Sequence, residues 1–563
     1  MNPARVASTS DSSTTLWKLG QYQNPIAVTF GDLDLLLCCF VIAPSTLILA
    51  FYFWTTPNVL KDRRRWHLPP GPPGLPFIGN ILDLSDGERM REKALAWTKK
   101  YGHVFHTKVG GADYIWLSSP KAVRDLMDKK SAIYSSRPPA PLAGDVASAG
   151  RRQLFMAYGP RYRTVRKISH ALLNITQSTK YQPVQDLESK QLLYDLLHDP
   201  EHFYDHNRRY SAGVIISITY GHRIPNWDNA LARSVYKVVN NMQNYASPGA
   251  WMVDTFPSLQ NFPEIFFGNW RTFGKKCFEH DSPIYLGLWG NLKKEVDTGK
   301  AKDCFCKDFY ESNPEKQGLD TLQAAYQCGG LVEAGSETTS AFLNTFLLFA
   351  TIHPEVVQNG QEELDRVVGS ERYPTWEDAP NLPYIRAIIK ELLRIRPPNK
   401  IGMQHSTTED DWYEGMFIPK GSLVMLNWWA INYDPERWES PYEFKPERYL
   451  GYDLPAAAYL NVADPNQRDH VSYGAGRRVC PGIHVAENSL YLNISRILWG
   501  FNIKKKQVNG KEITPSGDMV PGWMCIPQPF ECAIEVRSAK HAKIIECIWA
   551  EAEAELEPEE KLS

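Results

Sequence analysis

The sequence predicts a mainly α-helical protein with minor β-structure, in which a single N-terminal transmembrane helix precedes one large domain. Three observations predict this fold class. Apolar residues at helical spacing dominate the chain after residue 80, strand signals are few, and one uncharged apolar segment near the N-terminus has the length of a bilayer span. Helical periodicity and an uncharged stretch of about 20 residues are the usual signals for these two kinds of element.

The composition excludes several classes of protein. Of 563 residues, 43% are apolar and 22% charged, which are ordinary values for a globular chain. The net charge of −2 argues against a basic nucleic-acid-binding surface. Ten cysteines are too few for a disulfide scaffold of this length, so we expect mostly reduced thiols.

Residues 35–54 form the predicted transmembrane anchor, because 20 uncharged and mainly apolar residues are enough to cross a bilayer. Lys61 and three arginines at 63–65 follow the span, and positive flanks stay on the cytoplasmic side. Residues 1–34 are then a luminal segment, and everything after residue 60 faces the cytosol. A buried core helix is the alternative interpretation of the same apolar stretch.

Residues 55–80 form the predicted basic and proline-rich hinge, since LPPGPPGLP at 68–76 cannot be a helix or a central strand. Residues 81–546 are then the main domain, and residues 547–563 an acidic, solvated tail.

Within the main domain, four elements are predicted most clearly. Residues 354–368 begin with proline and end before Gly369, and residues 384–396 end before Pro397; both patterns are typical of helices. Residues 416–418 and 423–426 read as strands that flank a Pro-Lys-Gly turn.

The most informative stretch is YGAGRRVCPG, at residues 473–482. Its first two glycines permit a tight turn, and Pro481 favours the start of a helix. Cys480 would then lie at a helix N-terminus, where free N–H groups and the neighbouring arginines lower the pKa of a thiol. From these residues alone, Cys480 is a metal ligand, a buried core thiol, or a nucleophile with His484 as its base.

This loop resembles the haem-binding signature of the cytochrome P-450 monooxygenases. The matching residues are Gly476, Arg478, Cys480 and Gly482, with Tyr473 where the family has phenylalanine. The resemblance implies the P-450 fold, a haem b (iron protoporphyrin IX) cofactor, and Cys480 as the axial ligand of the haem iron. A thiolate ligand favours O–O cleavage.

Residues 334–339, AGSETT, resemble the oxygen-binding segment of the family's long central helix. Gly335 weakens a helix and permits close approach over a ligand. The resemblance gives Glu337 and Thr338 the catalytic role, an acid and an alcohol that relay protons during O2 activation. The alternative is a helix N-cap, which serine and threonine before an apolar run often form.

Glu391 and Arg394 resemble the family's E-x-x-R motif, and Arg448 lies in a segment similar to its P-E-R-F motif. The resemblance implies a buried structural triad of Glu391, Arg394 and Arg448 that holds the cysteine loop in place.

The resemblance also implies donors for the haem propionates. Arg166 and Arg478 are the main candidates, because arginine pairs well with carboxylates. Tyr162, in a segment similar to the family's W-x-x-x-R, and His405 are further candidates. An ordinary loop histidine is the alternative for His405.

Residues 66–540 carry the resemblance, which implies insertion of one atom of O2 into a lipophilic small molecule, in the manner of fungal secondary-metabolism members. The anchor and the proline-rich hinge match the microsomal branch and imply the endoplasmic reticulum membrane. By family analogy, the substrate pocket is lined by residues 136–156, 331–338, 400–403 and 523–526. A haem-thiolate isomerase or dehydratase and a non-catalytic, membrane-anchored binding protein are the alternatives.

Electrons have to come from another protein, because the chain has no flavin, nicotinamide or iron–sulfur motif. We expect an NADPH-dependent reductase in the same membrane, and no nucleic-acid partner. Arg163, Lys167, Arg468 and Arg477 could form a basic docking patch. Cys304 and Cys306 are interpreted as a surface pair.

Overall fold

The computed structural model describes Ser45, residues 62–558 apart from 77, 85, 86, 248 and 401, and Lys561. The chain divides into two compact units, Met1–Trp66 and His67–Ser563. The predicted luminal segment 1–34 and the predicted anchor 35–54 lie outside the described residues, apart from Ser45.

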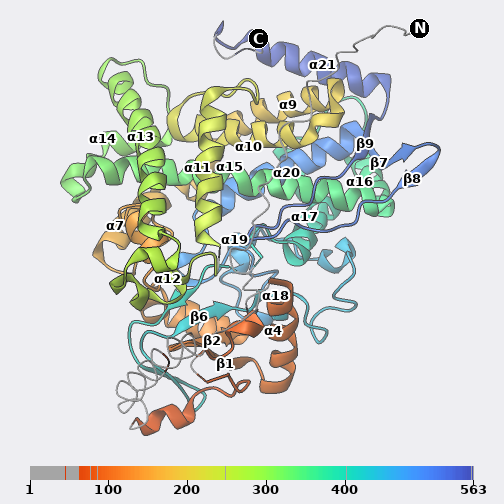
Figure 1. Cartoon of the computed structure of the whole chain (residues 1–563). Helices are drawn as coiled ribbons and strands as arrows, with labels where there is room; N and C mark the ends of the chain where they lie inside the picture. Colours follow the sequence, from red (N-terminus) through yellow and green to blue (C-terminus); the bar gives the residue numbers. More distant parts are fainter. Residues whose placement is uncertain are drawn as a thin grey trace, which may run out of the picture. The chain divides into compact units, whose positions relative to one another are not determined.

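The second unit is mainly helical, as predicted, and its helices are shown in Figure 1. They are α3 (Ile81–Leu84), α4 (Gly87–Tyr101), α5 (Pro120–Val123), α6 (Ser131–Tyr134), α7 (Pro160–Leu173), α8 (Ile175–Lys180), α9 (Gln182–His198), α10 (Phe203–Tyr220), α11 (Ala230–Ala246), α12 (Met252–Thr255), α13 (Trp270–Asp297), α14 (Phe305–Glu311), α15 (Thr321–Ile352), α16 (Pro354–Val367), α17 (Pro383–Ile395), α18 (Trp428–Asn432), α19 (Ala456–Tyr459), α20 (Ile483–Gly500) and α21 (Ala539–Ala554).

Two of these helices confirm the clearest sequence predictions. Helix α16 begins at Pro354, and Gly369 follows its end with a φ of +72°. Helix α17 begins at Pro383, where the N–H groups of Tyr384 and Ile385 donate to the Glu363 carboxylate at 3.0–3.1 Å. That carboxylate satisfies N–H groups that the first turn of a helix leaves without a backbone partner.

The strands form three small sheets. The first has the order β1–β2–β6–β3 (Val104–Val109, Ala112–Leu117, Leu423–Leu426, His405–Ser406), with β2 and β6 parallel and Ile115 opposite Val424. The second pairs β4 (Asp411–Tyr413) with β5 (Met416–Ile418), and the third has the order β8–β7–β9 (Lys511–Ile513, Phe501–Val508, Cys532–Val536). The two predicted strands, β5 and β6, have the predicted bounds, but they belong to different sheets.

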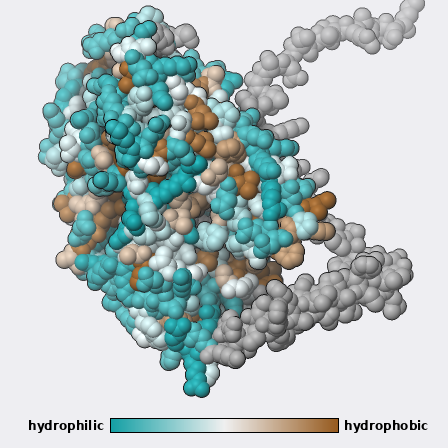
Figure 2. Space-filling model, turned by 90° about the vertical axis from the view of Figure 1, so that its left-hand side faces the viewer, coloured by the Kyte–Doolittle hydropathy of each residue, from teal (hydrophilic) through white to brown (hydrophobic). Residues whose placement is uncertain are grey.

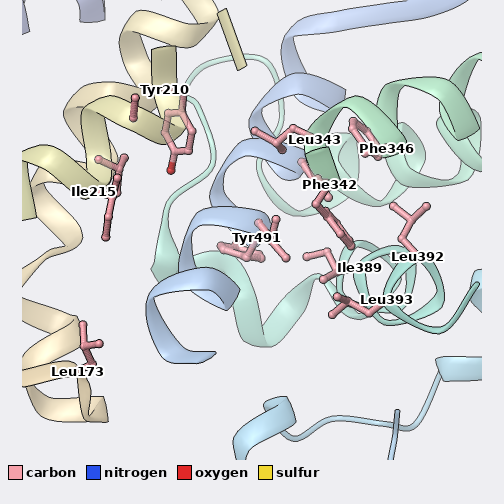
Figure 3. Close-up of a cluster of buried hydrophobic side chains, with 14 of the residues drawn as sticks. Leu173, Tyr210, Ile215, Phe342, Leu343, Phe346, Ile389, Leu392, Leu393 and Tyr491 are labelled. Atoms are coloured by element: carbon pink, nitrogen blue, oxygen red, sulfur yellow. The ribbon is translucent and has the colours of Figure 1, made fainter. Parts of the chain in front are cut away.

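Helix α15 is the centre of the core and packs against α10, α11, α13 and α20. It starts at the N-cap Asp320, whose carboxylate accepts the Gln323 N–H at 2.7 Å. Figure 3 shows Phe342 of α15 directed toward Ile389 of α17, with Tyr491 of α20 nearby. Helices of the N-terminal and C-terminal halves of the chain therefore share one hydrophobic core.

The proline-rich segment is extended, as predicted, but it is part of the body and does not act as a free spacer. The Pro70 carbonyl oxygen accepts the His106 N–H of β1 at 2.9 Å. A Cβ at Gly71 would lie 1.8 Å from the His106 carbonyl oxygen, so only glycine permits this contact. Leu75 and Gly79 then exchange two backbone hydrogen bonds of 2.9 Å. The predicted start of the main domain at residue 81 is therefore too late.

The predicted acidic tail begins inside helix α21, which runs to Ala554. Ile548 and Trp549 of this helix are buried, at 8% and 2% exposure. The boundary at residue 547 was wrong because the apolar face of α21 packs on α9, and the glutamates lie on the other side. Figure 1 shows α21 lying across α9.

The cysteines of the described part are eight free thiols. Cys304 and Cys306 are not a surface pair, because both are buried in the main core with Cys328. In the view of Figure 2, the described surface is mostly hydrophilic, with apolar residues in small groups.

Within the described residues, no single helix combines the length and hydropathy of a membrane span, and only α15 and α16 taken together, bent by 105°, do so.

Candidate haem-thiolate site

The cysteine loop, residues 473–482, is shaped by two glycines. Gly474 and Gly476 have φ values of +80° and +62°, in the left-handed region that favours glycine. A Cβ on Gly476 would lie 2.1 Å from the Met127 carbonyl oxygen. The Gly476 N–H donates to Asp128 Oδ1 at 2.7 Å. The loop is therefore fixed on the π-helical segment Arg124–Lys129 (η2).

Arg468 holds the same loop from within. It is 5% exposed, and its guanidinium donates to the carbonyl oxygens of His470 (3.1 Å) and Gly474 (2.5 Å). The prediction that Arg468 contributes to a surface docking patch is therefore wrong, because its charge is buried under the loop.

Cys480 follows this turn, and its thiol is partly buried. Its N–H donates to the Tyr473 carbonyl oxygen at 2.8 Å, and α20 begins three residues later, at Ile483. Burial raises the pKa of Cys480, although the Gly482 N–H and the charge of Arg166 act in the opposite direction. The helix terminus alone does not lower this pKa as predicted; a coordinated metal ion deprotonates a thiol outright.

Three arginines lie close together beside the loop, and none of them forms an ion pair with a carboxylate among the described residues. Arg478 donates to the carbonyl oxygens of Ser135 (2.9 Å), Gln153 (3.2 Å) and Met156, and Arg166 donates to Val479 O. Arg137 donates to the carbonyl oxygens of Leu154, Met403 and Gln404 at 2.7–3.0 Å. Burial, together with repulsion from a neighbouring arginine, lowers the pKa of Arg137 to about 9 and of Arg478 to about 10.

Tyr162 and His405 lie at this cluster but use their donors elsewhere. The Tyr162 hydroxyl donates to the Arg477 carbonyl oxygen at 2.9 Å, and its ring lies 3.6 Å from the Arg478 guanidinium carbon. His405 Nδ1 lies 2.7 Å from the Tyr134 carbonyl oxygen, which only accepts, and burial lowers the pKa of His405 well below its usual range. In this structure, both residues therefore donate to backbone carbonyl oxygens of the protein.

The two residues of α15 predicted for proton relay lie on different faces of the helix, one buried and one half-exposed. Glu337 is 5% exposed, and its Oε2 has no hydrogen-bond partner among the described residues. Burial raises the pKa of Glu337, and the charge of Arg208 lowers it in part. Thr338, on the half-exposed face, donates its hydroxyl to the Ala334 carbonyl oxygen at 2.9 Å. Glu337 and Thr338 are adjacent in sequence but do not hydrogen-bond each other.

Gly335 has a different role from the predicted one. A Cβ there would lie 2.5 Å from the Ile215 side chain, so the glycine permits close packing of α15 on α10. On the other face, Leu331, Thr338 and Thr339 are half-buried and Ala334 is exposed, although α15 runs through the core. This face of the helix therefore borders open space inside the domain.

The predicted structural triad is present. Arg394 Nε lies 2.7 Å from Glu391 Oε2, and Arg448 Nε lies 3.0 Å from Glu391 Oε1. Glu391 and Arg394 have no exposed side-chain surface, and Arg448 is 8% exposed. Removing one partner would leave a buried charge unpaired, which costs about 3–5 kcal/mol.

A cavity of about 90 Å³ opens next to Arg137. Its lining includes parts of two predicted pocket segments, 136–156 and 400–403, the latter through Gly402 and Met403. Tyr114, Tyr245, Trp251 and Gln404 also line it. A third predicted segment supplies Trp523 and Met524 to the apolar cluster that also holds Leu142, Tyr245 and Trp270.

Sequence reasoning missed Arg137 and a buried ionic cluster around Arg152. Arg137 lies directly before two prolines, a context that resembles an ordinary loop, and only the fold brings it to Arg478. The one sequence signal for Arg152 was its position in a predicted pocket segment.

The donor set fits a haem. Two propionates need cationic partners, and Arg137, Arg166 and Arg478 offer three guanidinium groups with no carboxylate among the described residues. Cys480 offers the thiolate, and the open face of α15 offers apolar side chains and a hydroxyl.

Comparisons with known proteins agree with this geometry. The family model "Cytochrome P450" matches residues 69–532. The chain is 47% identical over 511 residues to cytochrome P450 monooxygenase verL of Clonostachys rogersoniana, covering 90% of this chain and 93% of that protein. It is 36% identical over 509 residues to cytochrome P450 monooxygenase virE of Hypocrea virens, covering 90% and 91%.

A solved structure of a zebrafish cytochrome P450 with progesterone has the same fold, with a TM-score of 0.66 and 22% identity, covering 80% of this chain and 99% of that one. The chain therefore belongs to the cytochrome P450 family. It is an oxidoreductase with a haem cofactor, as the resemblance of its cysteine loop predicted.

Proposed function

We propose that this protein is a membrane-anchored haem-thiolate monooxygenase that inserts one atom of O2 into a lipophilic small molecule, by hydroxylation, epoxidation or oxidative rearrangement. The observation that carries the proposal is the site itself. A cysteine on a glycine loop fixed to η2 lies beside three arginines with no carboxylate partner among the described residues.

A haem, when bound, would supply O2 activation, and Cys480 would hold its iron as an electron-donating thiolate. Arg137, Arg166 and Arg478 would hold the propionates. Tyr162 and Arg468 keep the loop in place through their bonds to loop carbonyl oxygens.

Glu337 and Thr338 are proposed to supply protons. Because burial raises the pKa of Glu337, its carboxyl group keeps a proton to higher pH than an exposed glutamate. The Thr338 hydroxyl lies on the open face of α15, where it can hold a water that passes protons into the pocket.

The electron donor is proposed to be an NADPH-dependent reductase that docks on exposed basic side chains. Arg163, Lys167 and Arg477 are exposed. The Arg163 and Arg477 guanidinium carbons lie 5.8 and 5.1 Å from the centre of the Tyr158 ring, so the two charges are neighbours. We call Arg163, Lys167 and Arg477 the Tyr158 patch.

The double charge reversal Arg163→Glu/Lys167→Glu tests the Tyr158 patch. It is expected to slow reduction by the reductase about tenfold at low salt, and added salt should reduce the difference. Lys420→Glu, an exposed change on the turn between β5 and β6, is the control. Equal slowing by both variants, or a rate insensitive to salt, would contradict the docking site.

A lipophilic substrate is supported by the apolar cluster of Leu142, Tyr245, Trp270, Trp523 and Met524, which borders the cavity. Membrane anchoring through residues 35–54, in the endoplasmic reticulum with the catalytic domain in the cytosol, is proposed from the sequence. Support comes from four exposed apolar side chains on the segment between α11 and α13, since such side chains suit a bilayer: Met252, Phe262, Ile265 and Phe266. The fungal relatives support a place in secondary metabolism.

The function is tested by comparing metabolites with and without the protein, and by assaying the purified protein with reductase, NADPH and each accumulated compound. The proposal predicts substrate-dependent O2 consumption and a product that carries one oxygen atom from labelled O2. A product formed without O2 would favour an isomerase or dehydratase instead.

A further inference from the structure

A buried ionic cluster includes Glu333 of α15, next in sequence to the open face of that helix, and is not used by the proposed chemistry. Arg152 is 2% exposed, Asp281 has no exposed surface and Glu333 is 7% exposed. They come from three separate elements: the segment after residues 141–146, helix α13, and helix α15. We call Arg152, Asp281, Glu333 and Tyr285 the Arg152 clasp.

Arg152 is the centre of the clasp. Its guanidinium lies 2.8 Å from Asp281 Oδ2 and 2.7 Å from Glu333 Oε1, and it also contacts the Tyr245 hydroxyl of α11. The Tyr285 hydroxyl of α13 donates to Glu333 as well. One guanidinium therefore connects α11, α13 and α15, using donors that point in several directions at once.

The neighbouring helices are shaped to fit the clasp. A Cβ at Gly329 of α15 would lie 2.3 Å from the Tyr285 ring, so this ring lies flat on a glycine one turn before Glu333. Pro283 lies inside the continuous helix α13, between Asp281 and Tyr285. A proline inside a helix removes one backbone hydrogen bond. The clasp thus binds α13 on both sides of this proline.

The clasp also adjoins the cavity. Tyr245, which contacts Arg152, lines the cavity together with Phe155. Glu333 directly precedes Ala334, which is exposed on the open face of α15. The clasp therefore connects Tyr245, in the wall of the cavity, with α15, whose open face borders space inside the domain.

Stability alone does not explain such a cluster. Replacing a buried ion pair by apolar side chains of similar volume is often neutral or stabilising, so burying three charges gives little net stability. What the clasp does provide is a single fixed geometry, because two carboxylates and the Tyr245 hydroxyl fit around one planar guanidinium, while the Tyr285 hydroxyl fixes Glu333.

We infer that the Arg152 clasp holds α11 and α13 down on α15 and so limits the size of the ligand that reaches the haem pocket. Arg152, Asp281, Glu333 and Tyr285 are positioning residues for substrate size selection. This inference rests on the proposed function, since it assumes a ligand bound over a haem.

Arg152→Lys tests the clasp in the full-length holoenzyme, because lysine keeps the charge but loses the planar fork that serves both carboxylates. The probes are imidazole and the bulky triphenylmethyl-imidazole, which both ligate haem iron and shift its absorbance. The variant is expected to bind triphenylmethyl-imidazole about tenfold faster, while the imidazole rate changes less than about twofold. Amide hydrogen exchange in α13 is expected to rise as well.

Arg209→Lys is the matched control. Arg209 is also 2% exposed and pairs with two carboxylates, Glu188 and Asp195, but these lie on α9, away from the cavity. It should lower stability without changing the ratio of the two rates. Where Arg152→Lys does not fold, Tyr285→Phe removes a single hydroxyl and should change the ratio in the same direction.

The size-selection role would be overturned if Arg152→Lys changed the binding rates of both ligands equally or changed neither. It would also be overturned if Arg209→Lys changed the ratio of the two rates as much as Arg152→Lys does. A wild-type protein without a haem spectrum would overturn the proposed function instead, and unchanged exchange of α13 in the variant would then reject the clasp independently.

Discussion

Gly476 illustrates how one residue controls the cysteine loop. It has a left-handed φ of +62°, and a Cβ there would meet the Met127 carbonyl oxygen at 2.1 Å. Gly474 has a similar φ of +80°, but its Cβ would have no atom nearer than 3.9 Å. Substituting Gly474 therefore tests backbone strain alone, whereas substituting Gly476 tests backbone strain together with a steric clash.

Gly474→Ala is expected to cost about 1–2 kcal/mol of unfolding free energy, from left-handed strain alone. Gly476→Ala is expected to cost at least about twice as much and to reduce haem content, since the loop must leave η2. Urea unfolding and haem absorbance per mole of protein measure both effects. Equal losses in the two variants would show that contact with Met127 does not matter.

Glu487 on α20 makes the stability depend on pH. Burial raises the pKa of Glu487 to about 7 from 4.5. The folded protein therefore keeps a proton that the unfolded chain releases above pH 4.5, so stability is lost as the pH rises from 4.5 to 7. The Glu487 Oε1 accepts the Ala456 N–H at 2.7 Å, a bond that a glutamine carbonyl could also accept.

Glu487→Gln is thus expected to gain stability relative to the wild type between pH 4.5 and 7, by roughly 3 kcal/mol, with a plateau above pH 7. Denaturant unfolding at several pH values measures the difference. A difference that stays constant with pH would reject the buried, protonated Glu487.

At residue scale, the sequence was sufficient to predict residues whose setting is determined by a local motif. Cys480, Arg478 and the i, i+3 pair Glu391–Arg394 could be predicted because a few neighbouring residues determine their setting. Arg137 could not, because it reaches the site only through the tertiary fold. The hydrogen-bond partners of Tyr162 and His405 are carbonyl oxygens of the cysteine loop and of the end of helix α6, which a sequence pattern does not specify.

Among the helices, α21 lies beyond residue 532, where the match to the family model ends. Trp549 is 2% exposed, with the Tyr194 ring of α9 at 5.9 Å and the Arg223 guanidinium carbon at 5.4 Å. This C-terminal helix is therefore a part of the core in this chain.

Trp549→Ala is expected to lower the unfolding free energy by about 3–5 kcal/mol, the usual range for removing a buried aromatic side chain. Cys547→Ala, an exposed position on the same helix, is the control and should stay within about 0.5 kcal/mol. A loss below about 1 kcal/mol in Trp549→Ala would mean that α21 does not contribute to the core.

At element scale, the bounds of α16, α17, β5 and β6 followed from local signals such as proline, glycine and apolar periodicity. Strand partners did not follow, because β6 pairs with β2, some 300 residues away, and no local signal encodes such a contact. Composition also misled at the ends. The prolines at 68–76 suggested a free spacer and the glutamates a tail from residue 547, whereas backbone hydrogen bonds attach the first segment to the body and buried Ile548 and Trp549 attach the start of the second.

For the whole molecule, buried ion pairs tie the cysteine loop to the helical core. Glu391 of α17 binds Arg394 and Arg448, and the adjacent Lys390 lies 2.6 Å from Asp469, which precedes the loop. Lys390 and Asp469 are 3% and 1% exposed. The position of Cys480 therefore depends on α17 as much as on its own loop.

The central claim is that Cys480 ligates a haem iron as a thiolate, and the absorbance spectrum of the purified, reduced protein with carbon monoxide tests it most directly. We expect the strongly red-shifted band of a thiolate-ligated haem, and its loss in Cys480→Ala. A wild-type spectrum typical of histidine-ligated haem, or one without any haem band, would contradict the account.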